Sequence, residues 1–241
     1  MDLLETLSAA RTGISLMEIS AQTGLNISTC HHLLATLANR GYVIQDVRTK
    51  HYLLGNRILE LQVGRGQQID LIAEAGEVLR RLNEETREAV HLAVLQGGEL
   101  FTLAKLDAFH AVKVDTGFIG KSNAAHATAT GKAILAYLPA AKVEEIIRSK
   151  GLARFTERTI LEKEQLLEEL SRVRQLGYAV DNEEFQPGVF CVGAPVRDHS
   201  GEVIASISCS VPLMRVPMVR ITEPTCSAAV RLSGRLGYSG A

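Results

Sequence analysis

Two short helix-like segments joined only by residues 24–26 set the strongest limit on the fold of the N-terminal part of the chain. At the first segment, Ser15 is followed three residues later by Glu18, which is the capping-box pattern of a helix start. Gly24 is a typical helix end, and Asn26 can cap the next helix with its side-chain oxygen. The pattern predicts a helix of about two turns, a tight turn and a second helix.

The second segment, which Gly41 ends, has one apolar stripe and one polar side. The stripe follows helical spacing, and we expect it to pack inward. It consists of Cys30, Leu33, Leu34 and Leu37. The polar side carries little fixed charge, because its members are Ser28, His31, His32, Thr36 and Asn39.

Two strand-like runs, YVIQ (42–45) and HYLLG (51–55), follow and are joined by the polar turn DVRTK. Helix, turn, helix and β-hairpin is the order of a winged helix-turn-helix, although an ordinary helix pair before a hairpin would give the same pattern. Charge favours the first interpretation. Against Asp46 alone, residues 40–57 hold Arg40, Arg48, Lys50 and Arg57. A wing with this charge can reach DNA phosphates.

The composition limits the class of protein. A chain of 241 residues with 46% hydrophobic content is globular and long enough for two ordinary domains. Its net charge of -1 means that DNA binding must come from a local patch. Neither a signal sequence nor an apolar run of membrane-spanning length is present in the sequence, so we expect a cytoplasmic protein. The cysteines lack metal-like spacing and are expected to be reduced thiols: Cys30, Cys191, Cys209 and Cys226.

Residues 56–86 are typical of a helix interrupted near Gly64 and Gly66, because each glycine costs a helix roughly 1 kcal/mol relative to alanine. We place the boundary between two domains here. The expected organisation is an N-terminal domain over 1–58, a linker helix over 59–72 and a second domain over 73–241.

From Thr86 onwards strand-like and helix-like runs alternate. The two hairpins and the separate group of helices predict an α+β domain with an antiparallel sheet. We expect strands over 89–96, 99–106 and 111–116, helices near 128–137, 140–150 and 160–176, a strand-rich stretch over 178–211, and a last helix over about 222–236.

The strands VFCVGAPVR (189–197) and VIASISCSV (203–211) flank the turn DHSG. If Asp198 faces Gly201, Cys191 lies opposite Ser208. Serines could alternate with apolar residues simply because their face is wet, but the partner strand offers no charge on that face. We therefore expect a lined cavity, with Ile207, Cys209 and Val211 on the other face. The cavity face would carry Val189, Cys191, Gly193, Ser206, Ser208 and Ser210.

Several motifs in order resemble the IclR family of bacterial transcription regulators over nearly the whole chain. They are SLMEISAQTGLNISTCHHLLATLANRGYV (15–43), HATATGKAILAYLP (126–139) and RVRQLGYAVDNEEFQPGVFCVGAPVRDHSGEVIASISCSVP (172–212). The resemblance implies a winged helix-turn-helix, a linker helix and a GAF-like effector-binding domain. It also implies operator DNA and a small-molecule effector as partners, and a homo-oligomer, either a dimer or a dimer of dimers.

The DNA-contacting residues are expected at the start of the second helix and on the wing: Ser28, Thr29, His31, His32, Arg40, Arg48 and Lys50. The resemblance implies effector contacts at Ala129, Thr130, Asp181, Val189, Cys191, Ser208 and Ser210. Ala129 and Thr130 begin a helix, which favours an oxygen-bearing ligand such as a carboxylate, an aldehyde or a lactone. Asp181 could equally be a turn residue in a solvated acidic run.

The chain departs from the family pattern at two places. Relatives typically carry a basic residue at the position of Ile27 and an arginine at that of His32. The family also has a longer first helix, so MDLLETLSAA resembles a helix entered part way along. We expect the second helix to supply shape and hydrogen bonds, while the wing supplies the charge.

Two other functions compete with that of a regulator. In the first, Cys191 is the nucleophile of a hydrolase for a small ester or lactone, with His126 as base and Asp181 as orienting group. In the second, the same three residues bind zinc, since thiolate, imidazole and carboxylate are all zinc ligands. Neither is supported by a local motif. We therefore expect a repressor-type regulator that is not an enzyme and needs no metal or cofactor.

Overall fold

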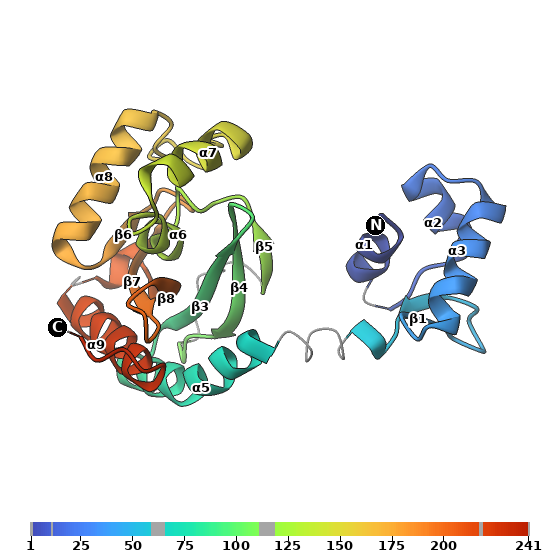
Figure 1. Cartoon of the computed structure of the whole chain (residues 1–241), viewed down its shortest axis with the longest axis horizontal. Coiled ribbons are helices and arrows are strands. Elements are labelled where there is room, and N and C mark those ends of the chain that lie inside the picture. Colours follow the sequence, from blue (N-terminus) through green and yellow to red (C-terminus); the bar gives the residue numbers. More distant parts are fainter. Residues whose placement is uncertain (1, 11, 59–65, 111–118, 217–218, 241) are drawn as a thin grey trace. The chain divides into compact units, whose positions relative to one another are not determined.

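The computed structural model describes residues 2–10, 12–58, 66–110, 119–216 and 219–240 (Figure 1). Contacts divide the chain into two compact units, Met1–Asp70 and Leu71–Ala241. This division falls within 59–72, the stretch assigned above to a linker. Residues 59–65, and thus Gly64, lie outside the described residues. In the part that is described, no helix is long and apolar enough to cross a membrane.

Residues 2–54 of the N-terminal unit include the helices and the two-stranded hairpin on which the predictions bear. They are α1 (Asp2–Ala9), α2 (Leu16–Thr23), α3 (Ile27–Asn39), β1 (Val43–Gln45) and β2 (Tyr52–Leu54). The predicted capping box is confirmed, since the Ser15 hydroxyl accepts the Glu18 N–H and the Glu18 carboxylate accepts the Ser15 N–H. Gly24 ends α2 at φ +71°, in the left-handed region that suits glycine.

The core of this unit confirms most of the predicted α3 stripe. Cys30 and Leu34 are fully buried, and Leu37 packs against them. Leu33 is the exception, because it is 42% exposed. The stripe is narrower than predicted since the unit is small, and the packing of α1, α2 and the hairpin covers only one side of α3. The buried core consists of Leu3, Leu7, Ile14, Ile19, Cys30, Leu34, Val43 and Tyr52.

The C-terminal unit is a six-stranded antiparallel sheet, which confirms the α+β prediction, and helices cover both of its faces (Figure 1). The strand order is β5-β4-β3-β8-β7-β6. The strands are β3 (Ala89–Gln96), β4 (Glu99–Leu106), β5 (Gly120–Ser122), β6 (Ala179–Asn182), β7 (Val189–Arg197) and β8 (Val203–Pro212). The helices are α5 (Gly66–Thr86), α6 (Ala129–Leu135), α7 (Ala140–Lys150), α8 (Lys163–Leu176) and α9 (Val219–Arg235), and η1 (Leu213–Arg215) is a short 3-10 turn. The strand predicted over 111–116 lies outside the described residues.

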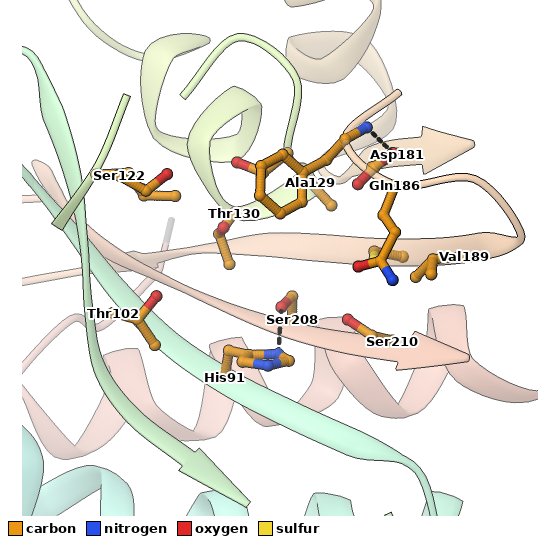
Figure 2. A pocket seen from close by; sticks show the side chains of 14 residues that line it. His91, Thr102, Ser122, Ala129, Thr130, Asp181, Gln186, Val189, Ser208 and Ser210 are labelled. Carbon is orange, nitrogen blue, oxygen red and sulfur yellow. Dashed lines mark hydrogen bonds between the residues drawn. The ribbon is translucent and has the colours of Figure 1, made fainter. Parts of the chain in front are cut away.

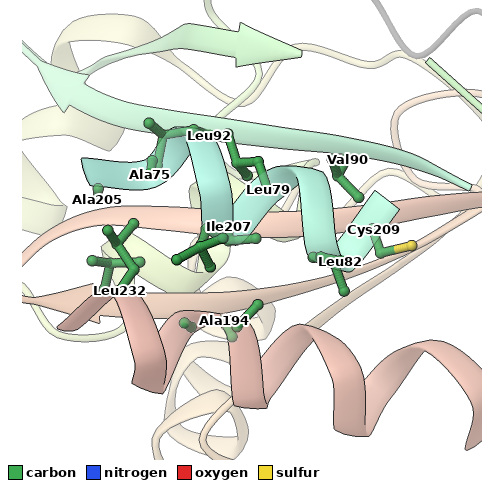
Figure 3. Packing of buried hydrophobic residues seen from close by; sticks show 14 of the residues in the cluster. Ala75, Leu79, Leu82, Val90, Leu92, Ala194, Ala205, Ile207, Cys209 and Leu232 are labelled. Atoms are coloured by element: carbon green, nitrogen blue, oxygen red, sulfur yellow. The ribbon is translucent and has the colours of Figure 1, made fainter. Parts of the chain in front are cut away.

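Two hydrophobic clusters hold the helices to opposite faces of the sheet. On one face α5 and α9 pack against alternate residues of β3, β7 and β8, including Leu92 and Ile207 (Figure 3). On the other face α6, α7 and α8 pack together over residues such as Ala93 and Ala179. Since each fully buried large aliphatic side chain contributes about 1.5–3 kcal/mol, this alternation fixes which face each strand residue occupies.

The predicted register of β7 and β8 is wrong by two residues. Cys191 lies opposite Ser210, not Ser208. The turn closes one residue later than expected, because the N–H of Asp198 donates to the carbonyl of Glu202, and a bulge near the end of β7 adds a further residue. A shift of two residues returns every side chain to its predicted face, so the prediction of which residues share a face is confirmed.

Gly193 lets α6 lie directly on β7. A Cβ atom at this position would stand 2.5 Å from the carbonyl oxygen of Ala129, closer than real Cβ contacts. Only glycine therefore allows the first turn of α6 to reach the serine-bearing face of the sheet. This close approach places Ala129 and Thr130 over β7 and β8.

Candidate functional site

The first candidate site is the outer side of α3. Asn26 caps the helix, since its side-chain oxygen accepts the N–H of Thr29 at 2.8 Å. Ser28, His31 and His32 are exposed, whereas Thr29 is half-buried. The rings of the two histidines stand edge to face, 6.1 Å apart. The start of α3 thus presents small polar groups and imidazoles in a fixed arrangement.

The wing adds charge to this unit. Asp46 holds the turn between β1 and β2, because its carboxylate accepts the N–H groups of Arg48 and Thr49 at 2.8 Å each. Lys50 has a left-handed φ of +60°, which turns the chain back into β2. Arg48 and Lys50 are exposed, as is Arg40 at the end of α3. These cations and the α3 start form an exposed surface, hereafter the α3–wing surface.

The second candidate site is a cavity between α6 and the sheet in the C-terminal unit (Figure 2). Its volume is about 90 Å³, several times the space that one water needs. All the residues predicted for effector contact line it, so the structure brings together side chains from α6, β6, β7 and β8. They are Ala129, Thr130, Asp181, Val189, Cys191, Ser208 and Ser210.

Sequence reasoning missed other residues of the cavity. Figure 2 shows His91 of β3, Thr102 of β4, Ser122 of β5 and Gln186 of the β6–β7 loop facing the same space. Alternation along β3 could have identified His91. Its neighbours Val90 and Leu92 both face α5, so the side chain of His91 must point to the opposite face of the sheet, where the cavity lies. The remaining signals were weak, since a threonine or serine on a strand is common.

The polar groups around the cavity are buried and partly bonded to one another. Ser208 Oγ lies 3.4 Å from His91 Nδ1, and burial lowers the pKa of His91 to about 4, so its ring is neutral. Ser206, next along this face, donates to the carbonyl of Thr130 at 2.9 Å and fixes α6 instead of lining the cavity. Hydroxyl groups from β4, β5, α6 and β8 thus surround a space with a neutral imidazole at its base.

Asp181 is a buried cavity residue, 2% exposed, and the view of it as a solvated turn residue is wrong. One of its carboxylate oxygens accepts the N–H groups of Glu184 and Phe185, so it also shapes the β6–β7 loop. Burial raises the pKa of Asp181 to about 7, although these two backbone bonds act in the opposite direction. Near neutral pH this group can both donate and accept hydrogen bonds.

Cys191 lies beside Asp181, with which it pairs across β6 and β7. Burial, followed by the negative charge of Asp181, raises the pKa of the Cys191 thiol well above its ordinary value. A thiol kept protonated is a poor nucleophile and a poor metal ligand.

The third member of the proposed triad lies elsewhere. His126 does not line the cavity, and its Nε2 is 3.0 Å from the carbonyl oxygen of Ala153. Among the described residues, moreover, no group of three or more His, Cys, Asp or Glu side chains could hold a metal ion. The hydrolase and the zinc site are therefore unsupported.

A buried ion pair joins two elements that line the cavity. Lys132 of α6 is 0% exposed, and its ammonium lies 2.6 Å from Glu184 Oε1 and 3.3 Å from Glu169 Oε1. Burial raises the pKa of Glu184, while the charge of Lys132 opposes this rise. The pair joins α6 to the β6–β7 loop that carries Phe185 and Gln186. Nothing in the sequence indicates that Lys132 is buried and paired, because its partners lie far along the chain.

The chain matches two protein-family models in sequence. The model described as "IclR helix-turn-helix domain" matches residues 1–47, and "Bacterial transcriptional regulator IclR C-terminal" matches residues 65–235. The HTH-type transcriptional regulator KdgR of Escherichia coli K12 is 34% identical over 228 residues, covering 93% of this chain and 86% of KdgR. The transcriptional repressor IclR of the same strain is 32% identical and covers 92% of this chain and 82% of its own length.

Solved structures show the same fold. An IclR homolog from Microbacterium hydrocarbonoxydans, complexed with 4-hydroxybenzoate, has a TM-score of 0.87 at 26% identity and covers 98% of this chain and 96% of its own. An ICLR regulator from Silicibacter sp. TM1040 has a TM-score of 0.82, also at 26% identity, and covers 100% of this chain and 96% of its own. The match therefore extends over both units.

Proposed function

Because the chain belongs to the IclR family of bacterial transcriptional regulators, we propose that a small oxygen-bearing metabolite in the cavity controls its binding to operator DNA. This protein is a DNA-binding transcription regulator with an effector-binding C-terminal domain. The observation that carries the proposal is the convergence of all seven residues on one cavity.

On the DNA side, residues 1–58 form the binding domain, with α3 in the major groove and the wing beside it. Exposure of the polar side of α3 and of the wing cations supports this assignment. Base contacts come from Ser28, Thr29, His31 and His32, and phosphate contacts from Arg40, Arg48 and Lys50. Residues 59–72 act as the linker, and 73–241 bind the effector and pair the subunits into a dimer that reads two half-sites.

On the effector side, the cavity suits a ligand with carbonyl, carboxylate or hydroxyl oxygens. Serine and threonine hydroxyls both donate and accept hydrogen bonds, and the protonated form of Asp181 donates one more. Neither lysine nor arginine is among the described cavity residues, so uncharged donors such as the serine and threonine hydroxyls and the Gln186 amide would hold any anionic group. The predicted anion site at the start of α6 belongs to a helix of only seven residues, so its contribution to anion binding is small and the hydroxyl groups are the main ligand contacts. A relative complexed with 4-hydroxybenzoate, a small aromatic carboxylate, is consistent with this class.

A ligand screen with DNA as the readout tests the proposal. Small carboxylates, aldehydes and lactones are first tested for a rise in melting temperature, because a ligand at 100 times its Kd adds about 2.7 kcal/mol of stability. Each hit is then added to the protein bound to the intergenic DNA next to its own gene at low salt. We expect at least one hit to change the DNA affinity.

Matched variants locate the binding site. Ser208→Val fills the cavity with a methyl group and should abolish the melting shift and the DNA response, whereas Ser227→Val, on the exposed side of α9, should keep both. A folded protein that binds no intergenic DNA would contradict the DNA side. A ligand response that survives Ser208→Val would contradict the cavity assignment alone.

A further inference from the structure

The first residue of α3 is an exposed apolar side chain at the end of the helix that meets DNA. Ile27 is 51% exposed, whereas Leu34 on the same helix is fully buried. We propose that Ile27 reads a thymine through contact with its 5-methyl group and so sets the preferred base pair at one position of each half-site. This inference rests on the placement of α3 in the major groove proposed above.

The cap of α3 makes Ile27 the first residue of the helix. The Asn26 side chain accepts the N–H of Thr29, and its carbonyl accepts the N–H of Cys30 at 3.0 Å, so the helix begins at Ile27. Side chains on a helix tilt towards its N-terminus. A first-turn residue therefore projects beyond the helix end, and in a helix-turn-helix these N-terminal residues contact base edges.

The chemistry of the side chain selects the base. Ile27 has no donor or acceptor, so it cannot read adenine, guanine or cytosine by hydrogen bonding. Thymine alone presents a methyl group in the major groove, and apolar residues recognise it by contact. From residue 27 to residue 39 the helix contains neither lysine nor arginine, so base discrimination depends on contacts of this kind and on the neighbouring Ser28 and His32.

Leu33 provides a matched control on the same helix. It is also exposed, at 42%, but it is six residues further along. At about 100° and 1.5 Å per residue, Leu33 stands about 120° around α3 from Ile27 and about 9 Å along it. A general loss of apolar surface would affect both positions, whereas methyl recognition is specific to Ile27.

The test removes the methyl group from the DNA and the side chain from the protein. Double-stranded sites are selected by the full-length protein from a random pool, and each thymine is replaced in turn by uracil, which lacks only the 5-methyl group. We expect one replacement per half-site to weaken binding by the wild type about fourfold, or about 0.8 kcal/mol. The same replacement should have no effect on Ile27→Ala and its full effect on Leu33→Ala.

Salt dependence separates this role from a charge effect. Ile27→Ala should leave the slope of log affinity against log salt unchanged, because an apolar contact releases no counterions. Unchanged melting temperature and non-specific DNA affinity establish that the variant is folded. If every uracil replacement is silent in the wild type, or the sensitive position stays sensitive in Ile27→Ala, the inference is wrong. Failure to enrich any sequence would overturn the placement of α3 as well.

Discussion

The α3–wing surface and the cavity use similar polar side chains in opposite surroundings. Ser28, His31 and Arg48 are exposed, whereas Asp181 and Ser208 are 2% and 4% exposed. Exposed polar groups keep their hydration, but buried ones must be paired to avoid a large desolvation cost. The exposed residues of the α3–wing surface can therefore change without refolding the unit, while the cavity residues belong to the core and their substitution affects stability.

Charge shows the contrast most clearly. The cations of the wing stand in solvent, while Lys132 is fully buried between Glu184 and Glu169. The wing cations are free to meet solvent or a partner, whereas Lys132 joins two elements of the fold. The predictions below test this difference, in order of decreasing effect.

The largest effect is expected for Lys132→Met. Removal of the ammonium leaves the buried Glu184 without its cation, while Glu169 keeps its pair with Arg172, and breaking a buried pair costs about 3–5 kcal/mol. Urea unfolding at pH 7 measures this loss. As a control, Lys142→Met breaks an exposed pair with Glu145 and should cost less than about 0.5 kcal/mol. Equal losses in the two variants would remove the distinction between buried and exposed charge.

Asp181→Asn should change how stability depends on pH. The native pKa of about 7 lies above the unfolded value near 3.9, so this group stabilises the fold below pH 4 and loses that contribution as the pH rises to 7. Relative to the Asn variant, the unfolding free energy of the wild type should fall by about 1.4 kcal/mol per pH unit in this window.

Asp46 on the wing is the control for this pH experiment, because its carboxylate is exposed. The N–H groups of Thr49 and Arg48 lower the pKa of the exposed Asp46, so it stabilises the fold above the unfolded pKa and loses this contribution as the pH falls. Asp46→Asn should therefore give a difference curve of opposite sign. A flat curve for Asp181→Asn would mean that burial does not raise the pKa of the Asp181 carboxyl.

Gly193→Ala should lower stability by about 1–3 kcal/mol, because the added methyl group overlaps the carbonyl of Ala129 and pushes α6 from β7. Gly76→Ala is the control, since nothing lies within 4 Å of its Cβ position and α5 should gain about 1 kcal/mol. Thermal unfolding measures both. If Gly193→Ala left the melting temperature unchanged, α6 would be able to move away from β7 at no cost in stability.

The smallest effect on stability, and one confined to DNA binding, is expected for Arg48→Ala. Its melting temperature should not change, because Arg48 is exposed on the wing. The slope of log DNA affinity against log salt should decrease in magnitude by about 0.9, the value for one lost phosphate contact. Lys142→Met should keep the wild-type slope. An unchanged slope for Arg48→Ala would exclude a phosphate contact by this residue.

Local signals predicted much of the fold. Ser15, Glu18, Gly24 and Asn26 mark both ends of α2 and the start of α3, because a cap depends on bonds within a few residues. Gly97 and Gly98 separate the strands expected over 89–96 and 99–106, and both have a positive φ, which suits glycine in a tight turn. The exposure of Leu33 was not predictable, because helical periodicity does not tell how wide a face the neighbouring elements cover.

Strand alternation was enough to predict which residues share a face of the sheet. Alternation in β7 and β8 placed Cys191 and Ser208 on one side, and this survived a register error of two residues because the side-chain period of a strand is two. Only the tertiary structure decided what stands opposite them. His91 reaches Ser208 from 117 positions earlier in the chain, and Lys132 meets Glu184 across 52, distances at which no local pattern reports contact. Burial created by this long-range packing then sets the pKa of Asp181, which the sequence left undecided.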